Sequence, residues 1–435
     1  MKKTTDQLIR EAKIKKPNAL VYSVLSDIGH GLYYRKCNVD IHRHVEPRDY
    51  RDKPVIIVAS HASRFDYAFV NYAMRRRRIN FVAAEYEFHR SKFKFVFKVG
   101  RVIPKKQFVS DIHTIRSITK IIKHEKNGCV CLFPDGYPTI GGAQQPTMLG
   151  TGKLLKHLGV HVLGVRIHGP YLVCPKFEVK ERYGKVEIEL DELFNPEQLQ
   201  QLSADEIQRK VDEALFCDDY EWNATRQHSY NRPDGRYAQN MEQVLYKCPN
   251  CGTELDMEGV NDVIRCKRCG NGAHLDDKYN LIPFEGSAIP LNPRVWFDWQ
   301  RREMRKAVSN PNFSMDEHVT LRLLPKYGYL HDNVTGLPAG DGMLHLDKEG
   351  LRYVGTREGK EWEVFIKIST LNTLVLNVDG SFFYTYASGE CLQFVPDSPS
   401  CTRWTLAVEE TYRVNGGKWQ NFPWFDYDAP LELQS

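Results

Sequence analysis

The chain has 435 residues, 42% of them hydrophobic and 26% charged, so it is long enough to form several globular domains with cores of their own. The net charge of +5 is small, and no run of about 18 apolar residues suggests a bilayer-spanning helix. Four of the 11 cysteines form a metal-binding pattern and the others are scattered or lie in apolar strands. This usage is typical of a reducing compartment, and we expect a cytoplasmic protein without a secretory signal.

The N-terminal segment, residues 5–35, is predicted to form one or two helices interrupted at Pro17. Leu20, Val24 and Ile28 line one side of the second helix. That side either packs on the protein's own sheet or lies in a membrane interface. Strands are predicted at residues 38–42, 55–59 and 79–84.

The strand at residues 55–59 is predicted to deliver a histidine and a carboxylate together. His61 follows this apolar strand, and Asp66 comes five positions later, where a helical pattern begins. Open α/β sheets bind ligands beyond the carboxyl ends of their strands. A carboxylate bonded to one ring nitrogen fixes the tautomer of a histidine and raises the basicity of the other nitrogen. Such a pair suits removal of a proton from a hydroxyl, although the same spacing also occurs by chance in solvated loops.

Positive charge is concentrated between Arg75 and Lys106, where eleven Lys and Arg residues stand against Glu85 and Glu87. Within this stretch, residues 88–99 mix aromatic and basic side chains. This composition suits an anionic surface, which can be phospholipid or single-stranded nucleic acid. A solvated face, or a helix that buries its phenylalanines, would give the same composition.

Residues 111–126 are predicted to form an amphipathic helix, and residues 129–133 a core strand that delivers Asp135 and Gly136 to the sheet edge of His61. A carboxylate there can bind an acceptor hydroxyl or organise the loop, and Pro-Asp-Gly is also a common turn. The glycines between residues 141 and 152 weakly indicate a phosphate-binding loop before a helix.

Four segments, in order, resemble the sequence blocks of the glycerolipid acyltransferases, which include glycerol-3-phosphate and 1-acylglycerol-3-phosphate acyltransferases. Residues 60–66 resemble the His-x-x-x-x-Asp block and residues 132–136 the Phe-Pro-Glu-Gly block. Residues 100–105 stand in the place of the second block, and residues 160–167 in that of the last, apolar strand block. The resemblance covers roughly residues 15–190 and implies an α/β domain with a mixed sheet flanked by helices.

The resemblance also implies roles and ligands. His61, oriented by Asp66, would be catalytic, and Arg101 would hold the phosphate of the acceptor, assisted by Lys105 or Lys106. The substrate-binding residues would be Ser63, Arg101, Lys105, Asp135 and Gly136. The donor would be acyl-CoA or acyl-carrier protein, the acceptor a lysophospholipid, and the protein a peripheral one on anionic phospholipid. No nucleic acid is expected as a partner.

The chain departs from the family pattern at two positions. Asp135 stands where the family usually has Glu, and Pro138 stands where it commonly has Arg. If that Arg normally reads the phosphate, this chain must use another base or prefer another acceptor.

Two Cys-x-x-Cys-Gly segments separated by fourteen residues, with ligands Cys248, Cys251, Cys266 and Cys269, are typical of a zinc ribbon. Four thiolates make a closed, structural site. The hydrophobic core of the ribbon is too small for the ribbon to fold without its metal. Iron–sulfur ligation and two redox pairs are the alternatives. Such ribbons often bind nucleic acid, so the ribbon alone says little about function.

The remaining chain is predicted to be rich in strands. Residues 218–240 lack periodicity and suggest a linker, and residues 291–314 suggest a linker helix that carries tryptophans and arginines. Seven short strands between residues 319 and 395 and a helix at 401–412 resemble a pleckstrin-homology-like domain. The expected domains are an acyltransferase domain (1–235), a zinc ribbon (240–290), a linker helix (291–314) and a β-rich domain (315–435).

The zinc pattern and the family resemblance together imply a zinc-containing acyltransferase that makes phosphatidic acid from 1-acylglycerol 3-phosphate in phospholipid biosynthesis. One alternative keeps the chemistry and changes the acceptor to glycerol 3-phosphate or another lysophospholipid. A second alternative is an inactive acyltransferase-fold scaffold that binds membrane or nucleic acid.

Overall fold

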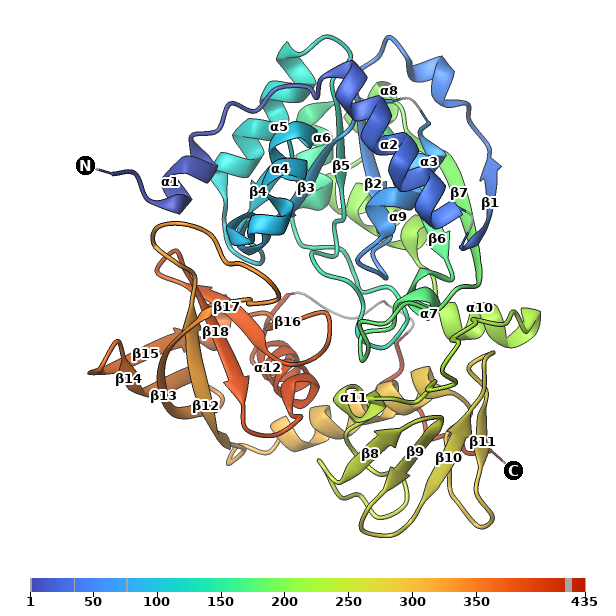
Figure 1. Cartoon of the computed structure of the whole chain (residues 1–435), viewed down its shortest axis with the longest axis vertical. Helices are drawn as coiled ribbons and strands as arrows, with labels where there is room; N and C mark the ends of the chain where they lie inside the picture. The colour runs from blue at the N-terminus through green and yellow to red at the C-terminus, as the bar shows by residue number, and fades with distance from the viewer. Residues whose placement is uncertain (1, 35, 76, 419–424, 435) are drawn as a thin grey trace.

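The computed structural model describes the chain except for residues 1, 35, 76, 419–424 and 435, and the side chains of residues 29, 30 and 32–34 are also outside the description. Arg76 of the basic stretch therefore lies outside the described residues. The described part forms a large N-terminal sheet, a small middle sheet and a C-terminal sheet (Figure 1). Among the described residues, none of the helices combines the length and the apolar composition of a bilayer-spanning segment.

The N-terminal sheet is mixed, with strand order β1-β7-β6-β2-β5-β3-β4. Strands β6 and β7 pair antiparallel, and every other neighbouring pair is parallel. The carboxyl ends of β2, β5, β3 and β4 therefore share one edge of the sheet. The strands are β1 (Asn38–Arg43), β2 (Val55–Ala59), β3 (Asn80–Ala84), β4 (Ile103–Lys105), β5 (Cys129–Leu132), β6 (His161–His168) and β7 (Lys185–Phe194).

Helices cover both faces of this sheet because its central strand is apolar on both faces. In β2, Ile56 and Val58 belong to the core formed with α5, α6 and α9, whereas Val55 and Ile57 belong to the core that contains Phe69 of α3. All residues of β2 are fully buried, which is typical of a parallel strand covered on both sides. The helices are α1 (Thr5–Arg10), α2 (Ala19–Tyr34), α3 (Asp66–Ala73), α4 (Ser91–Gly100), α5 (Ile112–His124), α6 (Thr151–Leu158), α7 (Pro170–Val173), α8 (Pro196–Gln201), α9 (Ala204–Leu215) and α10 (Asp219–Arg226).

The segment 218–240, which the sequence suggested to be a linker, is packed into the N-terminal part. Helix α10 lies within it, and its buried Asp219 accepts hydrogen bonds from the backbone N–H groups of Gly169 and Tyr171, both at 2.8 Å. The linker prediction is wrong because a short helix held by such long-range contacts has too few turns to show periodicity.

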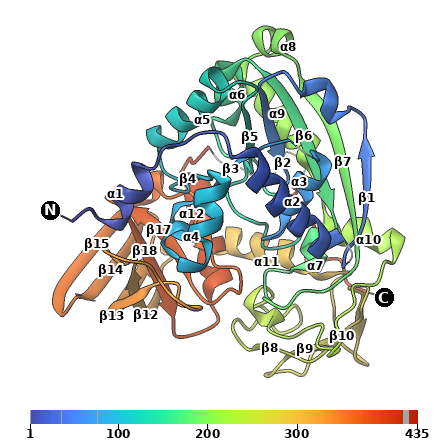
Figure 2. The same cartoon turned by 45° about the horizontal axis from the view of Figure 1, so that its top comes forward.

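The middle sheet is antiparallel, with order β11-β10-β9-β8, and it leads into α11. Helix α11 lies between the middle sheet and the C-terminal sheet (Figures 1 and 2). It is not an exposed linker, because Trp296 and Phe297 are fully buried and the Trp296 indole N–H donates to the Lys247 carbonyl at 2.8 Å. The elements are β8 (Met257–Val260), β9 (Val263–Cys266), β10 (Gly272–Leu275), β11 (Leu281–Pro283) and α11 (Pro293–Val308).

The C-terminal sheet is antiparallel, with order β15-β14-β13-β12-β18-β17-β16, and α12 packs on it. The strands and the helix predicted for this region are all present. The pleckstrin-homology-like assignment itself stays a prediction. The elements are β12 (Met315–Leu323), β13 (Leu337–Leu346), β14 (Gly350–Arg357), β15 (Lys360–Lys367), β16 (Val375–Leu376), β17 (Phe383–Ala387), β18 (Glu390–Pro396) and α12 (Cys401–Val414).

Candidate active site and metal centre

The imidazole of His61 and the carboxylate of Asp66 are in contact. His61 Nδ1 lies 2.8 Å from Asp66 Oδ2. The same carboxylate accepts the backbone N–H groups of Ala62 (2.8 Å) and Ser63 (2.9 Å) and the Ser63 hydroxyl (2.6 Å). With Nδ1 donating to this carboxylate, the neutral imidazole keeps its lone pair on Nε2. The contact that the sequence predicted is present; the catalytic role stays a prediction.

The His61 ring is packed against a neighbour but remains partly accessible to solvent. It stacks on Phe133 with ring centroids 4.5 Å apart, and 19% of its side chain is exposed, whereas the Asp66 side chain is fully buried. Among the described residues, no hydrogen bond is recorded at Nε2. The ring is therefore fixed by a buried carboxylate and an aromatic neighbour, while part of the His61 side chain stays exposed.

Ser63 is not placed to bind a substrate. The residue is 2% exposed, and its hydroxyl donates to Asp66 and accepts from the Phe65 backbone N–H at 3.1 Å. The substrate-binding role predicted for Ser63 is not supported, because its hydroxyl is hydrogen-bonded to the Asp66 carboxylate.

Arg101 lies at the other end of the strands from His61. It ends α4 in the left-handed conformation (φ 50°), two residues before β4. Since Ile103 pairs with Val82 in a parallel register, the residues before β4 share the amino edge of the sheet. The Arg101 guanidinium donates to the Lys13 carbonyl at 3.4 Å. The prediction that Arg101 holds a phosphate beside His61 is therefore not supported by its position.

Lys105 lies at the same sheet edge as His61, but its ammonium is already hydrogen-bonded. Its ammonium donates to the backbone carbonyls of Lys106 and, at 2.8 Å, Val109. Burial lowers the pKa of Lys105. Lys106, the next residue, lines a cavity of about 540 Å³ together with Arg10. Its ammonium also donates to the Gly389 carbonyl and lies 3.6 Å from Glu85.

Asp135 is fully buried and bonds to the loop that follows β5. Its Oδ2 accepts from Gln144 Nε2 at 2.8 Å, and burial raises the pKa of Asp135 well above its ordinary value. Gln144 Oε1 in turn accepts the His61 backbone N–H at 3.2 Å. This contact fits the loop-organising role, one of the two possibilities that the sequence left open, and the substrate-binding role of Asp135 stays a prediction. Gln144 was missed because no motif marks it.

Gly136 shapes the turn after β5. Its φ is +85°, and a Cβ there would lie 2.9 Å from the Phe108 ring, so a larger residue would be strained and crowded. Its carbonyl accepts from Gln107 Nε2 at 2.6 Å, which joins the loops that follow β4 and β5. The glycines at 141 and 142 do not form a phosphate loop: a Cβ on Gly141 would lie 2.2 Å from Phe297 of α11.

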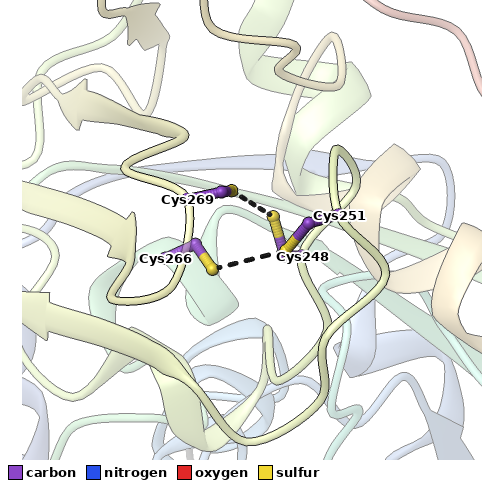
Figure 3. A group of neighbouring side chains, drawn as sticks. All are labelled: Cys248, Cys251, Cys266 and Cys269. Atoms are coloured by element: carbon purple, nitrogen blue, oxygen red, sulfur yellow. Dashed lines mark hydrogen bonds between the residues drawn. The ribbon is translucent and has the colours of Figure 1, made fainter.

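The four predicted cysteine ligands converge. The sulfur atoms of Cys248, Cys251, Cys266 and Cys269 all lie within 4.8 Å of one another (Figure 3). Two of the sulfur pairs are 3.7 Å apart, Cys248 with Cys269 and Cys251 with Cys266. A tetrahedron with Zn–S bonds of about 2.3 Å has edges of about 3.8 Å, so the cage fits zinc. All four ligands come from the protein and leave no open coordination position for a substrate, which is typical of a structural site.

Two family models match the chain. One, described as Acyltransferase, matches residues 38–168, and a zinc-ribbon model described as DNA directed RNA polymerase, 7 kDa subunit, matches residues 241–271. The crystal structure of the 1-acyl-sn-glycerophosphate (LPA) acyltransferase, PlsC, from Thermotoga maritima is similar over 45% of this chain and 76% of that chain, with 19% identity and a TM-score of 0.39. No curated protein matches. The chain thus carries a domain of the Acyltransferase family at residues 38–168, with a zinc ribbon appended after it.

Proposed function

We propose that this protein transfers a fatty acyl group from the thioester of acyl-CoA or acyl-carrier protein to the free hydroxyl of 1-acylglycerol 3-phosphate. The product would be phosphatidic acid. The proposal is carried by one observation: an imidazole oriented by a buried carboxylate lies at the carboxyl edge of an acyltransferase-family sheet, and within the described part of the chain no hydrogen bond engages its Nε2.

His61 acts as the general base. Nε2 takes the proton of the acceptor hydroxyl as that oxygen attacks the thioester carbonyl. The C–S bond of the tetrahedral intermediate then breaks, and the leaving thiolate receives the proton from Nε2. Asp66 stabilises the imidazolium between the two steps. The acceptor oxygen is itself the nucleophile, so no acyl-enzyme is required.

The phosphate of the acceptor is assigned to the cavity that Lys106 lines. Support comes from the position of Lys106 directly after β4, at the same sheet edge as His61. The cavity is also lined by Ser110 and by Arg10, whose guanidinium is paired with Glu85 and Asp111. A lysine ammonium binds phosphate as a point charge. This assignment replaces Arg101, which lies at the other end of β4, and Lys105, whose ammonium donates to the Lys106 and Val109 carbonyls.

An acceptor panel tests the proposal. Thiol release from acyl-CoA and from acyl-carrier protein is followed with the zinc-loaded full chain, with and without 1-acylglycerol 3-phosphate, glycerol 3-phosphate, and lysophospholipids with larger headgroups. We expect release that depends on 1-acylglycerol 3-phosphate and mass-spectrometric detection of phosphatidic acid. Turnover with only one of the other acceptors would keep the transferase activity and change the proposed acceptor. No acceptor-dependent release from either donor would overturn the activity and favour the scaffold alternative.

The active site is proposed to work at the surface of anionic phospholipid. Helix α2 contacts α4, and their exposed apolar side chains include Leu20 (75% exposed), Ile28 (55%) and Phe95 (66%). No residue of α4 is buried, and exposed lysines alternate with its aromatic residues. Apolar side chains with basic neighbours are typical of helices in a membrane interface. A pleckstrin-homology-like C-terminal domain, which the antiparallel strand order and the closing helix support, would add a second docking surface.

Replacing Leu20 and Phe95 together with serine should weaken binding to vesicles of phosphatidylglycerol and phosphatidylcholine by at least about tenfold. The reason is that burying one large apolar side chain contributes about 1.5–3 kcal/mol, and tenfold in affinity is about 1.4 kcal/mol. Co-sedimentation with vesicles measures it. Ile282→Ser, at a residue 51% exposed on β11 of the middle sheet, is the matched control and should bind as wild type. Wild-type binding by the double variant would exclude this surface.

A further inference from the structure

The loop after β5 holds the backbone of His61 on both sides. The Thr139 N–H donates to the His61 carbonyl at 3.0 Å, and Gln144 accepts the His61 N–H at 3.2 Å. Loops usually run over the surface, but most residues from 134 to 147 are buried. The position of the His61 ring therefore depends on what fixes this loop.

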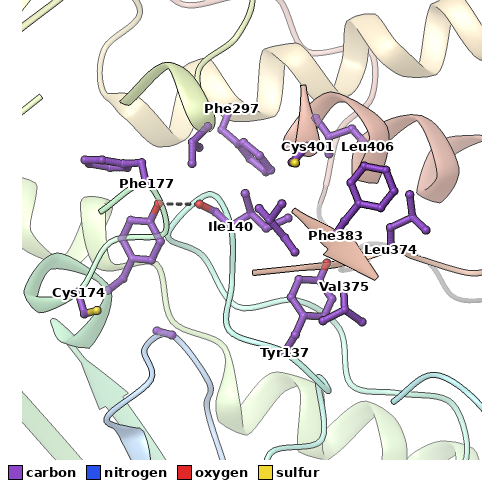
Figure 4. Packing of buried hydrophobic residues seen from close by; sticks show 14 of the residues in the cluster. Tyr137, Ile140, Cys174, Phe177, Phe297, Leu374, Val375, Phe383, Cys401 and Leu406 are labelled. Atoms are coloured by element: carbon purple, nitrogen blue, oxygen red, sulfur yellow. Dashed lines mark hydrogen bonds between the residues drawn. The ribbon is translucent and has the colours of Figure 1, made fainter. Parts of the chain in front are cut away.

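The C-terminal domain fixes the other side of the same loop. The Tyr137 hydroxyl donates to Glu409 Oε1 of α12 at 2.7 Å, and Thr373 donates to the same oxygen at 2.8 Å. Tyr137 is 1% exposed and Glu409 is fully buried. Figure 4 shows Tyr137 and Ile140 packed among side chains of the C-terminal sheet and α12, including Phe383. The loop is thus clamped between His61 and the appended domain.

The carboxylate that receives the Tyr137 hydroxyl is itself anchored through α11. Arg301 of α11 donates to Glu409 Oε2 at 2.6 Å, and the Arg301 side chain is 2% exposed. On the ribbon side, Gln300 of α11 accepts the Lys247 N–H at 2.8 Å, and Lys247 directly precedes the zinc ligand Cys248. A rigid chain of buried contacts therefore runs from the ribbon to the loop that holds His61.

We infer that Tyr137 is a positioning residue of the transferase, through which the C-terminal domain holds the His61 loop in its reactive geometry. The inference rests on the proposed function. Tyr137 does not touch the imidazole, so it acts through the loop and not on the substrate. A hydrogen bond to a buried carboxylate is stronger than one between neutral groups, and a catalytic base displaced by a fraction of an ångström loses rate. The C-terminal domain is on this account part of the catalytic unit, not only a docking module.

The test is Tyr137→Phe in the zinc-loaded full chain, which removes one hydroxyl and leaves the ring. The matched control is Tyr353→Phe, since Tyr353 of β14 is also 1% exposed and its hydroxyl donates to the Thr356 carbonyl at 2.9 Å, within the C-terminal sheet. We expect Tyr137→Phe to lower kcat about tenfold with KM for both substrates within about twofold, and the control to change neither. An unchanged kcat in Tyr137→Phe, or an equal loss in the control, would overturn the inference.

Hydrogen exchange separates failure of this inference from failure of the proposed function, because it needs no turnover. Faster exchange in the peptides around His61 and Thr139 is expected in Tyr137→Phe and not in Tyr353→Phe. Exchange as slow as in wild type would overturn the positioning role whatever the activity. If wild type transfers no acyl group to any acceptor, the proposed function fails, and the exchange result alone decides the role of Tyr137.

Discussion

Replacing His61 with alanine should lower kcat for acyl transfer by about 10²–10⁴-fold, the range that general-base catalysis contributes. The reason is that Nε2 of His61 is the group proposed to take the proton from the acceptor hydroxyl. The fold should survive, because the ring is partly exposed and packs mainly on Phe133. Steady-state thiol release measures the loss, and thermal unfolding checks the fold.

His161 supplies a matched control for this variant. Its Nδ1 also contacts a carboxylate, Glu192 Oε1 at 2.6 Å, and its side chain is 20% exposed, but it lies at the amino end of β6 opposite Val55. His161→Ala should keep wild-type kcat. Asp66→Asn should lose activity and some stability. The neutral amide is a weaker acceptor than the carboxylate for the hydrogen bonds from Ala62, Ser63 and His61. Wild-type turnover in His61→Ala would exclude the mechanism.

Removing zinc should unfold the ribbon. Binding free energies of structural zinc sites are about 10–16 kcal/mol in small zinc-finger peptides, and the ribbon has little core of its own. We expect a zinc content of one ion per chain and, on chelation, rapid hydrogen exchange across β8 to β10 with a lower unfolding temperature. Cys266→Ser should reproduce the effect of the chelator, since Cys266 is a buried ligand.

Cys391→Ser is the control for the zinc prediction, because Cys391 is buried in β18, outside the cage. It should retain the full zinc content. Full-length protein that binds no zinc, yet keeps the ribbon protected from exchange, would contradict a structural metal.

The local parts of this architecture could be read from the sequence. Residues close together in the chain determine the apolar strand before His61 and the helix that begins at Asp66. The same is true of the two Cys-x-x-Cys-Gly segments. The zinc cage follows directly from that spacing. These predictions hold because strand burial, helix start and knuckle geometry depend on residues within a few positions of one another.

The parts that could not be predicted depend on the tertiary structure. Arg101 was predicted at a strand start, which the structure shares, but its phosphate-binding role came from the family resemblance, and the sequence does not show that this end of the strand lies away from His61. Ser63 and Asp135 were expected to meet substrate, but both are buried, the Ser63 hydroxyl donates to Asp66, and Asp135 Oδ2 accepts from Gln144. The contact between Tyr137 and Glu409 joins residues 272 positions apart, and no sequence pattern marks it.

The central claim is that the His61–Asp66 pair moves the acyl group directly from thioester to acceptor hydroxyl, and a single-turnover experiment tests it most directly. Wild type and His61→Ala are mixed with a stoichiometric amount of acyl-CoA, with and without 1-acylglycerol 3-phosphate, and thiol release and intact protein mass are followed together. The account predicts unmodified protein throughout, and thiol release only by wild type in the presence of acceptor. A stoichiometric acyl adduct on wild type, or equal release by His61→Ala, would contradict it.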